Sequence, residues 1–317
     1  MKTQNKIWTA LAIVSLASTV IFTSCKKKEE VAPDTEQNTA TDNNMAESIV
    51  SDIESMGGEV SENSSLVSYK SSEATGITEE DGIAASPCAT VSGLGTKIYT
   101  VDFGTTGCVG YDGRTRTGKL IYDFSASTPS SAAYYRNPGF SMSVSSQNYV
   151  VDGNQVNIIS KTVKNTTPPS IPAGDQPGIN LTWAIAANVS IVKPNSGGTI
   201  SWSCSRTKEL MNTNDTTCYR GQSLHIIWNK AIVKLNGTAT GVNAKGENYT
   251  AVATDLIRDF NCAPDPLRPK RHPFISGTIA YTPGSRPLRL IDYGSASSCD
   301  MNATVTINGK VYNITLN

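Results

Sequence analysis

The feature that most constrains the fold is a long series of short β-prone segments separated by turn-forming residues. Between residues 88 and 317, segments rich in Thr, Ser, Val and Ile alternate with Gly/Asn/Asp turns such as 152–154 and 243–246. Residues 140–151 alternate apolar and polar side chains, which is the period of a strand with one buried face. No segment after residue 60 shows helical periodicity. A series of at least about ten such strands predicts an all-β fold, either an antiparallel β-sandwich or a broad curved meander.

Two segments near the ends of this region, 102–120 and 292–311, share one layout. Each contains Asp, an aromatic residue and Gly, then a short loop, a cysteine, nine further residues and Gly-Lys. Each also follows one strand-like stretch and leads into another. The matched layout predicts similar β–loop–β modules at about 88–124 and 262–317.

Six cysteines lie after residue 87 and are therefore candidates for disulfide bonds: Cys88, Cys108, Cys204, Cys218, Cys262 and Cys299. An even number of cysteines in an exported chain is typical of a disulfide framework. The matched modules predict one disulfide each, Cys88–Cys108 and Cys262–Cys299. This leaves Cys204–Cys218 as the third pair.

The carboxylates of the two modules, Asp102 and Asp292, invite a calcium-binding or catalytic interpretation. No D-x-[DN]-x-[DN]-G series surrounds either residue, as a calcium loop requires. We favour a structural role in which each Asp organises the loop while the following Gly adopts a positive φ.

Several short motifs across residues 88–317 carry a family resemblance. They are Asp292-Tyr293-Gly294 with Cys299-Asp300, Thr304 and Gly309-Lys310; Arg114 with Gly118-Lys119; Tyr135-Arg136 with Pro138-Gly139; Trp202 with Arg206-Thr207; and Gly237 with Gly241. Together they resemble a family of β-rich outer-membrane lipoproteins of Bacteroidetes. The resemblance implies a fold class and a location, and it implies no activity.

The first residues predict export. A short basic start precedes residues 7–22, which carry no charge and are too few to span a bilayer. Phe22, two small residues and Cys25 then resemble the lipobox read by the lipoprotein signal peptidase. We therefore expect residues 1–24 to be a lipoprotein signal peptide and Cys25 to be lipidated, in preference to an ordinary secretory peptide with a chance cysteine. The lipid anchor makes a membrane the first expected partner.

Residues 26–30, three lysines followed by two glutamates, resemble the surface-export signal of Bacteroidetes lipoproteins. The alternative is a charged spacer that keeps the tether solvated. We expect an outer-membrane lipoprotein exposed on the cell surface, with the periplasmic face as the alternative.

Charge divides the mature chain into two parts. Residues 26–87 carry four basic and fourteen acidic residues, whereas residues 88–317 carry twenty-one basic and thirteen acidic residues. With Cys25, the acidic part predicts a flexible tether over 25–87, with one short helix at 45–56. The basic domain could attract an acidic glycan, lipopolysaccharide, an acidic protein partner or its own tether.

The densest charge in the domain is a proline-rich basic loop formed by Arg268, Lys270, Arg271 and His272. It is a candidate patch for an anionic ligand. A solvated connection whose prolines prevent strand pairing is the interpretation we favour.

Three tryptophans lie in strand-like segments: Trp183, Trp202 and Trp228. A surface module could stack sugars on them, but a Trp in an alternating strand more often packs in the core. We expect all three in the core.

No catalytic constellation is recognisable. The two histidines, His225 and His272, lie in dissimilar contexts, no His/Cys metal spacing occurs, and the domain's two glutamates, Glu209 and Glu247, fall in expected loops. We expect no catalytic residue, metal or cofactor, and no nucleic-acid partner. The expected function is a non-enzymatic surface module that binds a glycan or protein or supports the envelope. The alternative is a hydrolase acting on polysaccharide.

Overall fold

A computed structural model describes most of the chain. The described residues are 38–62, 88–93, 96–110, 112–168, 180–211, 217–220, 223–226, 228–267, 272–295 and 298–315. They belong to one compact unit, Thr35–Asn317.

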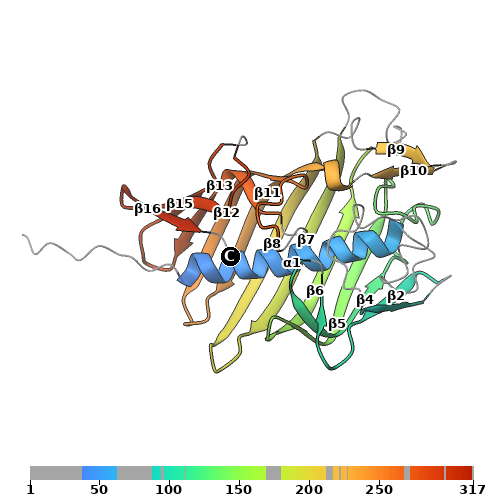
Figure 1. Cartoon of the computed structure of the whole chain (residues 1–317), viewed down its shortest axis with the longest axis horizontal. Helices are drawn as coiled ribbons and strands as arrows, with labels where there is room; N and C mark the ends of the chain where they lie inside the picture. The colour runs from blue at the N-terminus through green and yellow to red at the C-terminus, as the bar shows by residue number, and fades with distance from the viewer. Residues whose placement is uncertain are drawn as a thin grey trace, which may run out of the picture. The chain divides into compact units, whose positions relative to one another are not determined.

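One antiparallel sheet of fourteen strands dominates this unit (Figure 1). Its strands are β1 (Thr90–Ser92), β2 (Ile98–Asp102), β3 (Cys108–Val109), β4 (Thr115–Asp123), β5 (Ser141–Val151), β6 (Asn154–Asn165), β7 (Leu181–Val192), β8 (Thr199–Leu210), β11 (Ile232–Val242), β12 (Asn248–Asp259), β13 (Phe274–Pro283), β14 (Arg289–Asp292), β15 (Asn302–Ile307) and β16 (Lys310–Thr315). A separate hairpin contains β9 (Thr217–Arg220) and β10 (Ser223–Ile226), and the 3-10 turn η2 (Trp228–Lys230) leads into β11.

The strands follow one another in chain order across the sheet, apart from β3, which pairs only with β4, and the separate hairpin. The all-β prediction is confirmed, and of its two forms the broad curved meander is the one observed. The expected turns explain part of this order, because short turns join β5 to β6, β7 to β8, β11 to β12 and β15 to β16. At the β5–β6 hairpin, Val151 pairs with Asn154 while Asp152 and Gly153 both have positive φ, as a two-residue turn of this kind requires.

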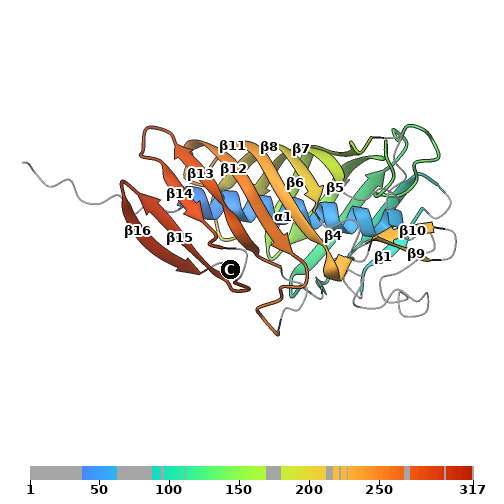
Figure 2. The same cartoon turned by 90° about the horizontal axis from the view of Figure 1, so that it is seen from above.

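The helix α1 (Asn38–Glu62) runs across the strands on one face of the sheet (Figure 2). Its residues Ile49, Ile53 and Met56 are buried, as their helical spacing predicts. The expected helix at 45–56 is therefore present but longer. The prediction of a flexible tether is wrong for 38–62, because this segment is packed against the sheet; the rest of 25–87 lies outside the described residues.

Gly57 lets α1 approach the sheet closely. A Cβ atom added to Gly57 would lie 2.5 Å from both Met142 Sδ and Tyr122 Cε1, on β5 and β4. The Tyr122 hydroxyl also donates a hydrogen bond of 2.9 Å to the Ile53 carbonyl of the helix. Glycine inside a helix costs about 1 kcal/mol relative to Ala, and here that cost is offset by close packing.

The two end modules resemble each other in their loops. Asp102 Oδ1 accepts the Gly104 amide at 2.9 Å, and Asp292 Oδ1 accepts the Gly294 amide at 2.8 Å. Both glycines have positive φ. These bonds agree with the turn role that the sequence favours. The likeness ends after the cysteines, because Gly118 lies at a register shift within β4, between residues 117 and 119, whereas the second module's Gly-Lys closes a hairpin.

The two disulfides of these modules, Cys88–Cys108 and Cys262–Cys299, are confirmed. The third prediction is wrong, because Cys204 is a free thiol on β8, close to Glu47 of α1 and to Arg206. Burial raises the pKa of this thiol to about 12. The side chain of Cys218 lies outside the described residues.

Candidate functional site

The sheet face that contacts α1 is basic as well as apolar, and the helix is acidic. Helix α1 contains six carboxylates and no basic residue. Ion pairs join five of them to the sheet and its loops: Asp42 to Lys193, Glu47 to Arg206, Asp52 to Arg116 and Arg114, Glu54 to Lys208 and Lys161, and Glu62 to Arg136. We call this set the ion-paired face of α1.

The tightest cluster surrounds Arg116 of β4, whose side chain is fully buried. Its Nη2 lies 2.7 Å from Asp52 Oδ2 on α1 and 2.5 Å from Asp112 Oδ2 on the preceding loop. Arg114 Nη1 lies 3.6 Å from the same Asp52 oxygen. Burial raises the pKa of Asp52, and the two guanidinium groups oppose that rise. Two arginines and two carboxylates thus compensate one another in a buried site.

A second cluster surrounds Glu54. Its Oε1 lies 3.2 Å from Lys208 Nζ and accepts a hydrogen bond of 2.8 Å from the Tyr135 hydroxyl. Lys161 Nζ lies 3.6 Å from the other oxygen. Burial alone would raise the pKa of Glu54, but the two ammonium groups outweigh it and hold the pKa below its ordinary value.

The remaining pairs extend this arrangement along the helix. Arg206 Nη2 lies 2.5 Å from Glu47 Oε2, and both side chains are buried. Near the start of α1, Asp42 Oδ1 lies 2.9 Å from Lys193 Nζ. The second oxygen of Asp42 accepts the Ala244 amide at 2.7 Å. The carboxylates therefore fix the position of α1 along the sheet from its first turn to its last.

Sequence reasoning named Arg114, Arg136 and Arg206 only as motif residues and missed the role of these cations as partners of the helix, although a signal for it exists. On β8, Trp202, Arg206, Lys208 and Leu210 occupy alternate positions and share the face that meets the helix. Two cations at apolar positions of a strand indicate that something acidic covers that face, because a buried charge requires a partner. The net charge of the two chain parts carries the same information. The interpretation in which the basic domain attracts its own acidic segment is the one that the structure shows.

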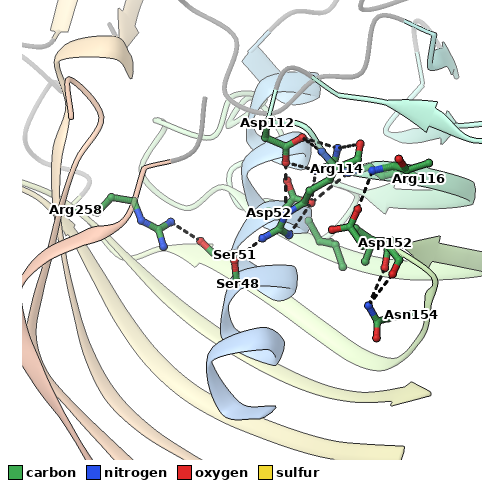
Figure 3. Close-up of polar contacts among 12 residues, drawn as sticks. Ser48, Ser51, Asp52, Asp112, Arg114, Arg116, Asp152, Asn154 and Arg258 are labelled. Carbon is green, nitrogen blue, oxygen red and sulfur yellow. Dashed lines mark hydrogen bonds and ion pairs between the residues drawn. The ribbon is translucent and has the colours of Figure 1, made fainter. Parts of the chain in front are cut away.

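The opposite side of α1 is different. Its partly exposed residues follow helical spacing and include Ser48 and Ser51. Figure 3 shows Arg114 and Arg258 on either side of the helix, each directed toward one of these serines. Arg114 Nη2 donates to Ser48 Oγ, and Arg258 Nη1 donates to Ser51 Oγ at 2.9 Å. We call the partly exposed side of α1 that contains Ser48 and Ser51 the serine stripe.

Arg258 of β12 differs from the cations of the ion-paired face. Among the described residues no carboxylate lies within ion-pair distance of it, and its Nε has no hydrogen-bond partner. Its guanidinium group lies 4.5 Å from the centre of the Phe274 ring. Burial lowers the pKa of Arg258; Glu47 opposes this, and the neighbouring Arg114 lowers it further. Arg258 is thus a partly buried cation without an ion-pair partner among the described residues.

A cleft of about 700 Å³ lies beside the serine stripe. Its polar lining includes Asn44, Ser48, Arg114, Asp152 and Arg258. Its apolar lining comes from the helix and from β13 to β16, and includes Met45, Ile49, Phe274, Ile291, Val305 and Ile314. A volume of this size lies in the range of about 300–1,000 Å³ that small-molecule sites occupy.

The structure describes only one residue of the predicted basic patch. Arg268, Lys270 and Arg271 lie outside the described residues. His272 also lines the cleft, and its Nδ1 lies 2.8 Å from the Cys262 carbonyl oxygen. The basic loop as a whole is therefore untested, and its one described member is held beside the cleft.

The tryptophans Trp183, Trp202 and Trp228 are at most 7% exposed, as expected for core residues. They form no exposed platform, because each faces the helix side of the sheet or packs on other rings. Glu209 lies in a strand rather than a loop, and Glu247 lies in a turn. Each pairs with a partly exposed cation, Lys234 or Arg286.

Among the described residues, no group of His, Cys, Asp or Glu could hold a metal ion, and no helix is long and apolar enough to cross a bilayer. Comparison of the chain with family models, with curated proteins and with solved structures found no match.

Proposed function

We propose that this chain is a lipid-anchored protein of the outer membrane. Its β-rich domain is exposed on the cell surface and is a non-enzymatic binding module. The single observation that best supports binding is the cleft beside the serine stripe, where Arg114 and Arg258 meet an apolar lining. Such a combination of an apolar wall and a few directed polar groups is typical of binding sites.

The carboxylates beside the cleft favour binding over hydrolysis. Glu47 is paired with Arg206, and Asp152 Oδ1 accepts the Thr115 amide at 2.9 Å. A glycoside hydrolase needs two carboxyl groups facing its substrate, one to donate a proton and one to act as base or nucleophile. Both described carboxylates instead have structural partners.

The anchor and the location rest on the sequence. The apolar run 7–22, the small residues before Cys25 and the thiol itself coincide in register. The resemblance to β-rich lipoproteins of Bacteroidetes supports the same location. The disulfide bond in each end module is typical of proteins in an oxidising compartment outside the cytoplasm.

Metabolic labelling with an alkyne analogue of palmitate tests this proposal. Cells producing the full chain should yield a labelled band in the outer-membrane fraction, and Cys25→Ser should abolish both the label and the membrane association. Protease added to intact cells should degrade the labelled protein if it faces outward, whereas protection of the protein would place it on the periplasmic face. Absence of label on the wild-type chain would refute the anchor.

A further inference from the structure

The cleft beside the serine stripe contains a cation, Arg258, that meets no carboxylate within ion-pair distance among the described residues. Helix carboxylates approach Arg114, Arg116, Lys161, Arg206 and Lys208 within 4.0 Å. Arg258 lies on the same face of the sheet but meets a serine hydroxyl and an aromatic ring instead. Withdrawing a cation from water without an anionic partner is costly, so a site that keeps one favours an anion as its occupant.

The geometry of the two arginines defines where that anion would bind. Arg114 and Arg258 donate to Ser48 and Ser51, which are one helical turn apart on the stripe. Among the described residues, nothing forms a hydrogen bond with two buried atoms of these guanidinium groups, Nη1 of Arg114 and Nε of Arg258. Figure 3 shows the two side chains approaching the helix from opposite sides. Guanidinium groups bind carboxylate and phosphate oxygens through paired N–H donors.

The cleft also has apolar side chains in its lining. Its partly exposed apolar side chains are Met45 of the helix, Phe274 of β13 and Ile314 of β16. A fully polar anion such as inorganic phosphate would leave this surface in contact with water. An anion that carries an alkyl chain would cover it, and burial of apolar area adds about 25 cal/mol per Å².

We infer that the cleft binds an amphiphilic anion, with its oxyanion between Arg114 and Arg258 and its alkyl chain against Met45, Phe274 and Ile314. This inference rests on the proposal that the chain is a binding module, and it names the ligand class. The oxyanion could be the carboxylate of a fatty acid or the phosphate of a lipid, and the two sources share the chemistry that the arginines recognise.

Titration calorimetry with the purified protein tests the inference, using decanoate, decyl phosphate and the neutral decanol below their aggregation limits. Decanoate, decyl phosphate or both should bind with micromolar affinity, and decanol should bind at least about tenfold more weakly. Preference between the two anions identifies the source. Equal binding of decanol, or no binding by any of the three, would overturn the inference.

Variants locate the site. Arg258→Gln should weaken anion binding about tenfold or more, and Met45→Asp should weaken it through repulsion and loss of apolar contact. Lys234→Gln is the matched control, because it removes one positive charge from a partly exposed pair with Glu209 outside the cleft. Far-ultraviolet circular dichroism establishes that each variant is folded. Affinity unchanged in both folded cleft variants would overturn the inference, while palmitate labelling of the chain would be unaffected and would still test the proposed anchor.

Discussion

The two sides of helix α1 differ in how the cations beside them are compensated. On the ion-paired face, Arg116 is fully buried and meets two carboxylates, whereas beside the serine stripe Arg258 meets a hydroxyl group and a ring. The first arrangement holds the helix in place, because removing either partner leaves a buried charge. The second leaves a cation without an ion-pair partner among the described residues. The difference separates groups that maintain the fold from groups that are suited to binding.

The largest expected effect comes from breaking the ion-paired face at Arg116. Arg116→Met should lower the free energy of unfolding by about 3–5 kcal/mol, because Asp52 and Asp112 would remain buried without their main cation. Urea denaturation followed by tryptophan fluorescence measures this loss. Lys234→Met is the control, since its pair with Glu209 is partly exposed and should contribute at most about 1 kcal/mol. Equal losses in the two variants would remove the distinction between the pairs.

Glu54→Gln should have the next largest effect. At neutral pH we expect a loss of about 1.5–3 kcal/mol, because Lys208 and Lys161 lose their carboxylate while the side-chain volume is kept.

The same variant should change the acid limb of the stability curve. The folded-state pKa of Glu54 lies below its ordinary value of 4.5, so the unfolded state binds the proton more readily. Its contribution is therefore complete above about pH 4.5 and is lost as the pH falls through the folded-state pKa. The free energy of unfolding, measured by urea denaturation at several pH values from 7 to 3, should fall less with decreasing pH for Glu54→Gln than for the wild type. An equal fall in the two proteins would contradict the lowered pKa of Glu54.

Arg258→Gln should change stability little. It removes one hydrogen bond to Ser51 and the contact with Phe274, but it leaves no described carboxylate without an ion-pair partner and relieves the burial of a charge. We expect a change within about 1 kcal/mol in either direction. A loss as large as that of Arg116→Met in the same urea experiment would place Arg258 in the structural set and would erase the contrast between the two sides of α1.

The smallest effect should come from the hydroxyl groups of the serine stripe. Ser51→Ala removes the acceptor of Arg258, and in a partly exposed site water can replace it, so we expect a loss of about 0.5 kcal/mol. Thermal unfolding of Ser51→Ala measures this loss. Ser55→Ala, on the same partly exposed side of the helix, is the control. A loss above about 2 kcal/mol would show that the stripe contributes to holding the helix.

Much of the sheet was predictable from the sequence, because alternation and turn chemistry are local. The 152–154 turn and the two loops at Asp102 and Asp292 need only their own residues to be recognised. The two disulfides followed from matched layouts, but Cys204 could not be assigned in this way. Its place in the middle of β8, facing the helix, depends on which strand pairs with which.

The site was harder to predict for a related reason. Composition classified residues 38–62 as a solvated acidic segment, since their mean hydropathy is too low to form a core alone. The helix packs on the sheet because its apolar residues, such as Ile53, are buried there and its carboxylates meet cations more than 50 residues away in the chain, such as Arg116 and Arg206. The opposite charges of the two chain parts indicate such an attraction, but only the pairing of strands specifies its partners.

The central claim is that α1 is an integral part of the domain, held on one face of the sheet by its buried apolar residues and its ion-paired carboxylates. Native-state hydrogen exchange of the α1 amides in the purified protein tests it most directly. The account predicts that amides 46–60 exchange with opening free energies close to those of β7 and β8, because the helix is released only when the sheet unfolds. Exchange of these amides at the rate of an unstructured chain, while β7 and β8 stay protected, would contradict it.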